Sequence, residues 1–253
     1  MKPFFLVLAR DERYVDEKIE ELKRLGVPYL VVCGKKLNHP NVVYREPKGK
    51  YDAINFGFRF IPKDVDVVAL NDVDTKISNF EAAIKLFNSK DVALVFAKVL
   101  AEEGPQNMFL NMLRALRRKL PIAASGDLML VRYDVLKKVL PLKPCKAEDS
   151  YLLFKVLELG YKVADCPKCS VIGKKTKMVR EEESYKRRTV CGIYQALHYS
   201  KPPGFIRLFY MLLPMISPIL LVSGKTGYFW MKGILLGLID FLRGDRTGVW
   251  QPA

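Results

Sequence analysis

The sequence predicts an α/β fold in which a mostly parallel central sheet is flanked by helices. Short apolar runs that are typical of buried strands alternate with amphipathic stretches that are typical of helices. The chain has 253 residues, of which 50% are hydrophobic and 27% charged, so it can bury a large core. This composition excludes a disordered chain, a collagen and a small disulfide scaffold.

The first elements follow a strand–helix–strand order. The apolar run at 4–9 predicts a buried strand, and apolar residues spaced three or four apart then predict a helix over 11–25. Gly26 ends that helix, and 29–33 predicts the second strand. The same patterns predict further strands at 42–44, 65–70, 92–97, 127–132 and 161–165, and further helices at 51–60, 79–88, 106–119, 134–139, 147–159 and 183–199.

Residues 201–253 differ in kind from the rest of the chain. The Lys-Pro-Pro-Gly run at 201–204 marks a boundary, so we expect a catalytic-type α/β domain over 1–200 and an added module over 201–253. The apolar runs 205–222 and 227–242 are short and carry charges and edge aromatics. They predict a helical hairpin that lies in, or dips shallowly into, a membrane surface. The alternative is an ordinary helical hairpin that packs on the α/β domain.

The net charge of +15 supports a membrane surface more than a nucleic acid as partner. Residues 166–253 carry 14 basic and 5 acidic residues together with the longest apolar runs. An anionic small substrate such as a nucleotide would use the same charge locally. No nucleic-acid-binding motif is present, so we expect no nucleic-acid partner. The N-terminus turns acidic too soon for a signal peptide, which favours a cytoplasmic face.

Asn71-Asp72-Val73-Asp74 follows the predicted strand 65–70. Two carboxylates spaced two residues apart can share one hard divalent cation, which in turn can hold a diphosphate. The alternative is a turn in which the aspartates cap backbone amides. The position at the carboxyl end of a buried strand favours the cation site, because ligands of such sheets bind there.

Two further pairs of charged residues stand at predicted helix starts. Glu148-Asp149 either complements the helix dipole or places Asp149 as a base in a ligand crevice. Arg187-Arg188 either forms a solvated basic face or binds phosphate oxygens. Cys166 and Cys169 have metal-ligand spacing, but no second pair follows, so we expect buried thiols instead of a zinc site, and a disulfide between the two is the alternative.

The order of these motifs along the chain resembles the order found in a known protein family. Ala9-Arg10-Asp11-Glu12 comes first, and the Gly49–Gly57 segment, Asp72-Val73-Asp74, Ser125-Gly126-Asp127, Ala147-Glu148-Asp149 and Arg187-Arg188 follow in turn. This succession over residues 3–199 resembles the family 2 glycosyltransferases with a GT-A fold. Within that family it resembles the dolichyl-phosphate-mannose-synthase-like and archaeal membrane-associated mannosyltransferases.

The resemblance implies a role for each matching residue. It implies that Asp72 and Asp74 hold Mn²⁺ or Mg²⁺ on the donor diphosphate, and that Asp149 is the general base of an inverting transfer. It places Arg10, Glu12, Lys50, Asn55, Asp72, Arg187 and Arg188 on the donor side, and Gly126, Asp127 and Glu148 on the acceptor side.

Two departures from the family pattern narrow this interpretation. Cys33-Gly34-Lys35 stands where members often carry acids that grip the base, so the nucleotide base stays open. The Trp of the family's Q-x-x-R-W motif is missing, which argues against a processive synthase.

The sequence therefore predicts a metal-dependent hexosyltransferase on the cytoplasmic membrane face, with a lipid-linked or glycan acceptor. GDP-mannose is the favoured donor, and a UDP-sugar is the alternative. A non-catalytic, membrane-bound interaction protein is the rival from another class. A nucleotidyltransferase would need a Gly-rich phosphate loop after the first strand, and Ala9–Glu12 supplies none.

Overall fold

The computed structural model describes residues 1–101, 115–116, 120–173 and 178–249. Their strands form one sheet in the order β3-β2-β1-β4-β7-β6-β8-β5. The strands are β1 (Pro3–Ala9), β2 (Tyr29–Cys33), β3 (Val42–Tyr44), β4 (Val67–Asp72), β5 (Thr75–Ser78), β6 (Val92–Ala101), β7 (Leu128–Arg132) and β8 (Lys162–Gly173). The predicted α/β class is confirmed.

The sheet is parallel in its first half and mixed in its second. Strands β3, β2, β1 and β4 run parallel, whereas β7 is antiparallel to both of its neighbours. The register of the parallel strands pairs Ala9 with Cys33 and Leu8 with Asp72. Arg10, Lys35 and Asp74, which follow these strands, therefore leave the sheet at the same edge.

Strand β1 shows why the sheet needs helices on both faces. Phe4, Leu6 and Leu8 belong to one core cluster, and Phe5 and Val7 to the other. Successive side chains of a strand point to opposite faces, so both faces of β1 are buried. Helices α1 (Val15–Leu25) and α3 (Glu81–Ile84) cover one face, and α2 (Lys50–Gly57), α5 (Tyr133–Val139) and α6 (Glu148–Glu158) cover the other.

Three sequence predictions differ from the observed elements. The predicted helices 51–60 and 79–88 each tighten into a 3₁₀ turn at their C-terminal end, and the predicted strand 161–165 continues to Gly173 as β8. Strand β5 was not predicted, because its Thr-Lys-Ile-Ser sequence is short and polar. The predicted helix 106–119 lies almost wholly outside the described residues.

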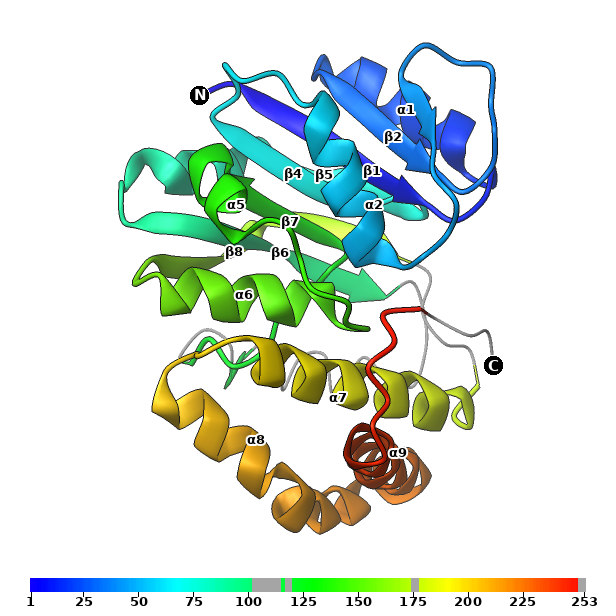
Figure 1. The fold of residues 1–253 in the computed structure, drawn as a ribbon, viewed down its shortest axis with the longest axis vertical. Helices are drawn as coiled ribbons and strands as arrows, with labels where there is room; N and C mark the ends of the chain where they lie inside the picture. Colours follow the sequence, from blue (N-terminus) through cyan, green and yellow to red (C-terminus); the bar gives the residue numbers. More distant parts are fainter. Residues whose placement is uncertain (102–114, 117–119, 174–177, 250–253) are drawn as a thin grey trace.

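The C-terminal elements form a further layer below α6 (Figure 1). Helix α7 (Glu181–Tyr199) precedes α8 (Gly204–Ile216), a 3₁₀ segment (Ser217–Ser223) and α9 (Gly224–Leu242). Helix α9 packs closely on α7, because a Cβ at Gly233 or Gly237 would lie 2.7 Å from the Glu183 carbonyl or 2.5 Å from the Arg187 carbonyl. Small residues therefore let the two helix backbones approach each other.

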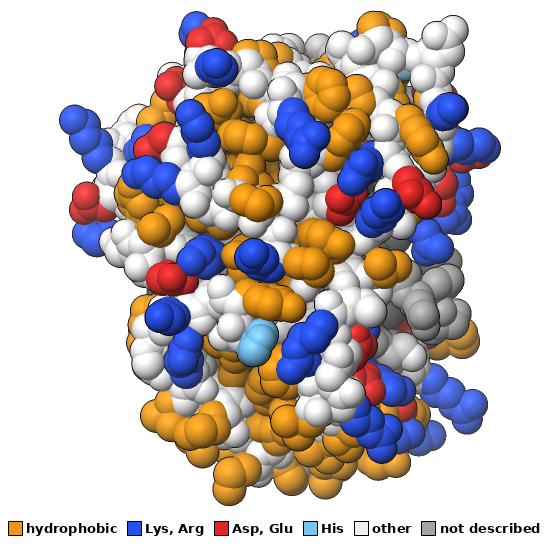
Figure 2. Space-filling view, in the orientation of Figure 1, with side chains coloured by type: hydrophobic (Ala, Val, Ile, Leu, Met, Phe, Trp, Pro, Cys, Tyr) orange, Lys and Arg blue, Asp and Glu red, His pale blue; other side chains and the backbone are white. Residues whose placement is uncertain are grey.

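The other side of this tail is apolar and exposed. Met215, Ile219 and Val222 are 77%, 70% and 87% exposed. Figure 2 shows hydrophobic side chains gathered at this end of the molecule. Among the described residues, the helical segment Gly204–Leu242 is the one that is long and apolar enough to cross a membrane, and only 17% of its most apolar window is buried.

We predict that Gly192→Ala lowers the free energy of unfolding by about 1–3 kcal/mol, because overpacking a close contact forces the backbone to shift. A Cβ at Gly192 on α7 would lie 2.5 Å from the Ala147 amide nitrogen, just before α6. Urea unfolding followed by circular dichroism measures the change. Gly204→Ala is the control, since nothing lies within 4 Å of its added methyl group. Equal stability of the two variants would contradict the packing.

Candidate active site

A buried cluster of charges lies where α2, β4 and α6 meet. Lys50 is the first residue of α2, Asp72 is the last of β4, and Glu148 is the first of α6. The Lys50 ammonium is 2.6 Å from Asp72 Oδ2 and 3.8 Å from Glu148 Oε1. The Lys50 ammonium thus links Asp72, which is predicted on the donor side, to Glu148, which is predicted on the acceptor side.

The pKa values of this cluster reflect its burial. Burial raises the pKa of Asp72 to about 6, against the opposing attraction of Lys50. Burial likewise raises the pKa of Glu148 to about 7, with Lys50 opposing and Asp149 adding to the rise. Burial alone would lower the pKa of Lys50, but Asp72 and Glu148 raise it well above its usual range. Lys50 therefore stays charged while both acids titrate near neutral pH.

Asp149 lies beside this cluster and faces a tight turn. Burial raises its pKa, although Asp149 Oδ1 accepts a 2.7 Å hydrogen bond from the Ser150 amide. A Cβ at Gly126 would lie 3.5 Å from Asp149 Oδ2 and 3.6 Å from Glu148 Oε1. The predicted acceptor-side turn at 125–127 therefore does lie against both acids. A buried carboxylate with a raised pKa is suited to proton transfer.

Hydrogen bonds from Thr75 and Lys18 hold the turn that carries Asp72 and Asp74 in place. Thr75 Oγ1 donates to the Asp72 carbonyl at 2.8 Å and accepts from Asn71 Nδ2 at 2.9 Å. The buried Lys18 ammonium of α1 donates to the Thr75 carbonyl. Sequence reasoning missed Lys18 and Thr75. The available signal was a lysine within the apolar stripe of the helix, three residues after the buried Val15.

The residues of this turn fit a hard divalent cation. Asp72 Oδ1 is buried and has no hydrogen-bond partner among the described residues. The Asp74 side chain is exposed two residues further on. Carboxylate oxygens are the ligands that Mn²⁺ and Mg²⁺ prefer. The part of the chain that the structure describes contains no cluster of three metal-binding side chains.

Of the two arginines on α7, Arg188 lies nearer the acids. Arg187 forms a bidentate ion pair with Asp240 of α9, at 2.6 and 2.7 Å. Burial lowers the pKa of Arg188, and the opposing attraction comes from Tyr185, Glu148 and Asp149. The two arginines therefore differ: Arg187 joins α7 to the tail, whereas Arg188 interacts electrostatically with Glu148 and Asp149.

The remaining predicted donor-side residues lie at different depths. Arg10 is exposed after β1, and Glu12 pairs there with Lys35 from the loop after β2. Asn55 donates to the Leu142 carbonyl at 3.0 Å and accepts from the Leu142 amide at 2.7 Å. Its amide thus holds the segment before α6 against α2, and its predicted contact with a donor stays a prediction. The five cysteines are all buried and free.

Comparison with solved structures identifies the fold. The chain resembles the mannosyltransferase PcManGT from Pyrobaculum calidifontis, solved with GDP-Man and Mn²⁺, with a TM-score of 0.72 and 16% sequence identity. The likeness covers 96% of this chain and 87% of that one. The chain has the GT-A fold.

Two other similar structures support this assignment. GalNAc-T7, solved with UDP, GalNAc and Mn²⁺, has a TM-score of 0.57 at 10% identity, over 97% of this chain and 56% of that one. Glucosyl-3-phosphoglycerate synthase from M. tuberculosis has a TM-score of 0.51 at 16% identity, over 80% and 82% of the two chains. No known family profile and no curated protein sequence matches the chain.

The free energy of unfolding should fall between pH 5 and pH 8. We predict that it falls less in the Glu148→Gln variant than in the wild type. Because the folded-state pKa of Glu148 is raised to about 7, its contribution is complete below its unfolded pKa and is lost as the pH rises through 7. An uncharged glutamine avoids that loss, so the decline in the free energy of unfolding should shrink by about 1–3 kcal/mol. Urea unfolding in EDTA at both pH values measures it.

Glu158→Gln on the same helix is the matched control. Burial would raise the pKa of Glu158, but the hydrogen bonds from the Lys201 amide and from Lys155 lower it overall. Its contribution is therefore present above its unfolded pKa, so this variant should lose stability at pH 8. An identical pH dependence in wild type and Glu148→Gln would contradict the buried cluster.

Proposed function

We propose that the chain is a metal-dependent, inverting glycosyltransferase that transfers a hexose from a nucleotide sugar. The observation that carries the proposal is the meeting of Asp72, Lys50 and the Glu148-Asp149 pair at one edge of the sheet. The GT-A fold supports it, and two of the similar structures, PcManGT and GalNAc-T7, contain Mn²⁺ with a nucleotide or nucleotide sugar. The likeness to PcManGT favours GDP-mannose as the donor, with a UDP-sugar as the alternative.

The reaction uses three carboxylates in two roles, metal binding and proton transfer. Asp72 and Asp74 would hold Mn²⁺ or Mg²⁺, which when bound offsets the negative charge of a departing diphosphate. Asp149 takes the proton from the acceptor hydroxyl, and that oxygen then attacks the anomeric carbon of the donor. The bond from that carbon to the diphosphate breaks, and inversion follows from this single displacement. Lys50 and Arg188 add positive charge beside the diphosphate.

Raised pKa values support this assignment of the base. A carboxyl group that accepts a proton from a hydroxyl works best when its pKa lies near the working pH. Burial raises the pKa of Asp149, and its neighbour Asp127 contributes to the rise. Lys50 limits it, so the ammonium tunes the base as well as neutralising Asp72.

We predict that Asp72→Asn abolishes Mn²⁺-dependent nucleotide binding, because it removes the charge of a central metal ligand. Thermal-shift measurements with GDP, UDP and CDP, each with Mn²⁺ and with EDTA, detect binding, since a ligand of the folded state raises the melting temperature. Asp149→Asn should keep that shift while transfer falls by about 10²–10⁴-fold. Asp91→Asn, in an exposed ion pair with Lys162, is the control for loss of one carboxylate.

Each outcome of this panel decides between the alternatives. A Mn²⁺-dependent shift with GDP alone would establish the favoured base, and a shift with UDP alone would establish the other. Absence of any shift in the wild type would overturn the enzyme proposal and favour a non-catalytic interaction protein.

We propose further that α8 and α9 bind the cytoplasmic membrane face and present a lipid-linked acceptor to the site. The exposed apolar side chains around Met215, Ile219 and Val222 support the proposal, as does the excess of basic residues after residue 166. Helix α9 packs on α7 through Gly233 and Gly237, whereas its side chains Leu235, Ile239 and Leu242 are exposed.

We predict that the double variant Met215→Glu/Ile219→Glu lowers partitioning onto vesicles of anionic lipid by about 10-fold or more, since it removes apolar burial and adds repulsion. Cosedimentation measures the bound fraction. Leu159→Glu, at an exposed apolar position of the α/β domain, should bind as the wild type does. Equal loss in both variants would show a general charge effect and contradict the membrane surface.

A further inference from the structure

The chain returns from the tail to the α/β domain after α9. We call residues 244–249 the C-terminal strap. Figure 1 shows it rising from the end of α9 past α7 toward the loops below the sheet. It ends close to two loops that precede residues of the charge cluster, and the contacts that hold it there are polar and specific.

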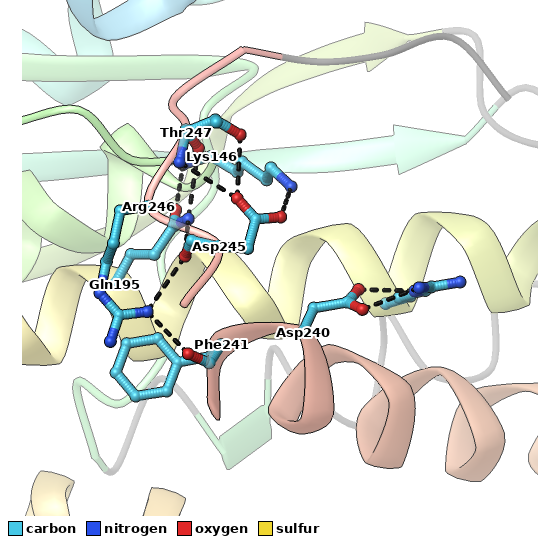
Figure 3. Close-up of polar contacts among 8 residues, drawn as sticks. Lys146, Gln195, Asp240, Phe241, Asp245, Arg246 and Thr247 are labelled. Atoms are coloured by element: carbon cyan, nitrogen blue, oxygen red, sulfur yellow. Dashed lines mark hydrogen bonds and ion pairs between the residues drawn. The ribbon is translucent and has the colours of Figure 1, made fainter. Parts of the chain in front are cut away.

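Asp245 and Gln195 fix the first half of the strap. Asp245 pairs with Lys146, both side chains being largely buried, and accepts from Thr247 Oγ1 at 2.9 Å. The buried Gln195 of α7 donates from Nε2 to the carbonyls of Asp245 and Thr247 at 3.0 and 3.2 Å. Its Oε1 accepts from the Lys146 amide at 2.9 Å. Figure 3 shows these groups converging on the strap.

Gly248 fixes the second half against the start of α2. A Cβ at Gly248 would overlap the Tyr51 ring and lie 3.0 Å from the Cys145 amide nitrogen. The Gly248 carbonyl packs on Gly49, whose φ of 115° suits glycine. The strap therefore touches the residues on either side of Lys50 as well as Cys145 and Lys146, which precede Glu148.

We propose that the C-terminal strap is a positioning element, which holds the loop of Lys50 and the loop of Glu148-Asp149 at a fixed separation. The Lys50 ammonium must reach Asp72 and Glu148 at once, so a shift of either loop separates the donor-side and acceptor-side charges. This inference rests on the proposed function for its effect on transfer, but not for its effect on the loops.

Charge reversal of the Lys146–Asp245 pair tests the proposal. In Asp245→Lys and in Lys146→Asp the pair becomes repulsive, so amide hydrogen exchange should accelerate about tenfold or more at residues 49–53 and 145–151. The remaining strands and helices should exchange as in the wild type. The double variant Lys146→Asp/Asp245→Lys restores the attraction and should restore protection. Asp245→Asn, which keeps the Thr247 contacts, gives the same local readout if a reversal fails to fold.

Asp240→Asn is the matched control, because Asp240 also pairs with a basic residue but lies on α9 and points to Arg187, away from the strap (Figure 3). It should leave both loops protected. In a transfer assay, the reversed variants should lose about tenfold in kcat with nearly unchanged KM for the donor, since misplacement of the base slows the chemical step.

Unchanged exchange at 49–53 and 145–151 in every strap variant would overturn the positioning role. Acceleration spread over the whole chain would also overturn it, because that pattern reports global destabilisation. Local acceleration in a protein that binds no nucleotide with Mn²⁺ would instead leave the strap in place and overturn the proposed function.

Discussion

The ion pair of Lys50 with Asp72 is the interaction on which the arrangement of the site depends. Asp72 and Glu148 are largely buried, and two ionised carboxylates could not share such a place without a cation between them. The ammonium compensates both, and so ties the start of α2, the end of β4 and the start of α6 to one point. These elements lie far apart in the sequence, and the fold brings them together at this ion pair.

The surrounding structure supports that point from two directions. Lys18 and Thr75 hold the Asp72–Asp74 turn from the α1 side of the sheet, because Lys18 donates to the Thr75 carbonyl and Thr75 donates to the Asp72 carbonyl. Asn55 binds both polar backbone groups of Leu142 and holds α2 against the segment before α6. The C-terminal strap then contacts the residues beside Lys50 and the residues that precede Glu148. The proposed transfer needs this rigidity, because small misplacements of reacting groups slow a reaction strongly.

The sequence predicted the fold class and most strands, since apolar periodicity is a local signal. Its resemblance to a known family named Lys50, Asp72 and Glu148, which the structure brings together. The sequence did not predict β5, whose polar residues depend on pairing with β8. It left Arg187 and Arg188 equivalent, because neighbouring helical residues are distinguished only by what packs on each side of the helix. The buried Lys18 and the contacts of Asp245 likewise arise from tertiary packing, which no local pattern records.

The most direct measurement is the crystal structure of the chain with GDP and Mn²⁺, located by the anomalous scattering of manganese. The account predicts a manganese peak in contact with Asp72 and Asp74, a diphosphate bound to the same ion, and Asp149 facing the open side of the site. Lys50 should remain in contact with Glu148. A manganese peak or a nucleotide bound away from the β4 edge, with Lys50 and Asp72 still paired, would contradict it.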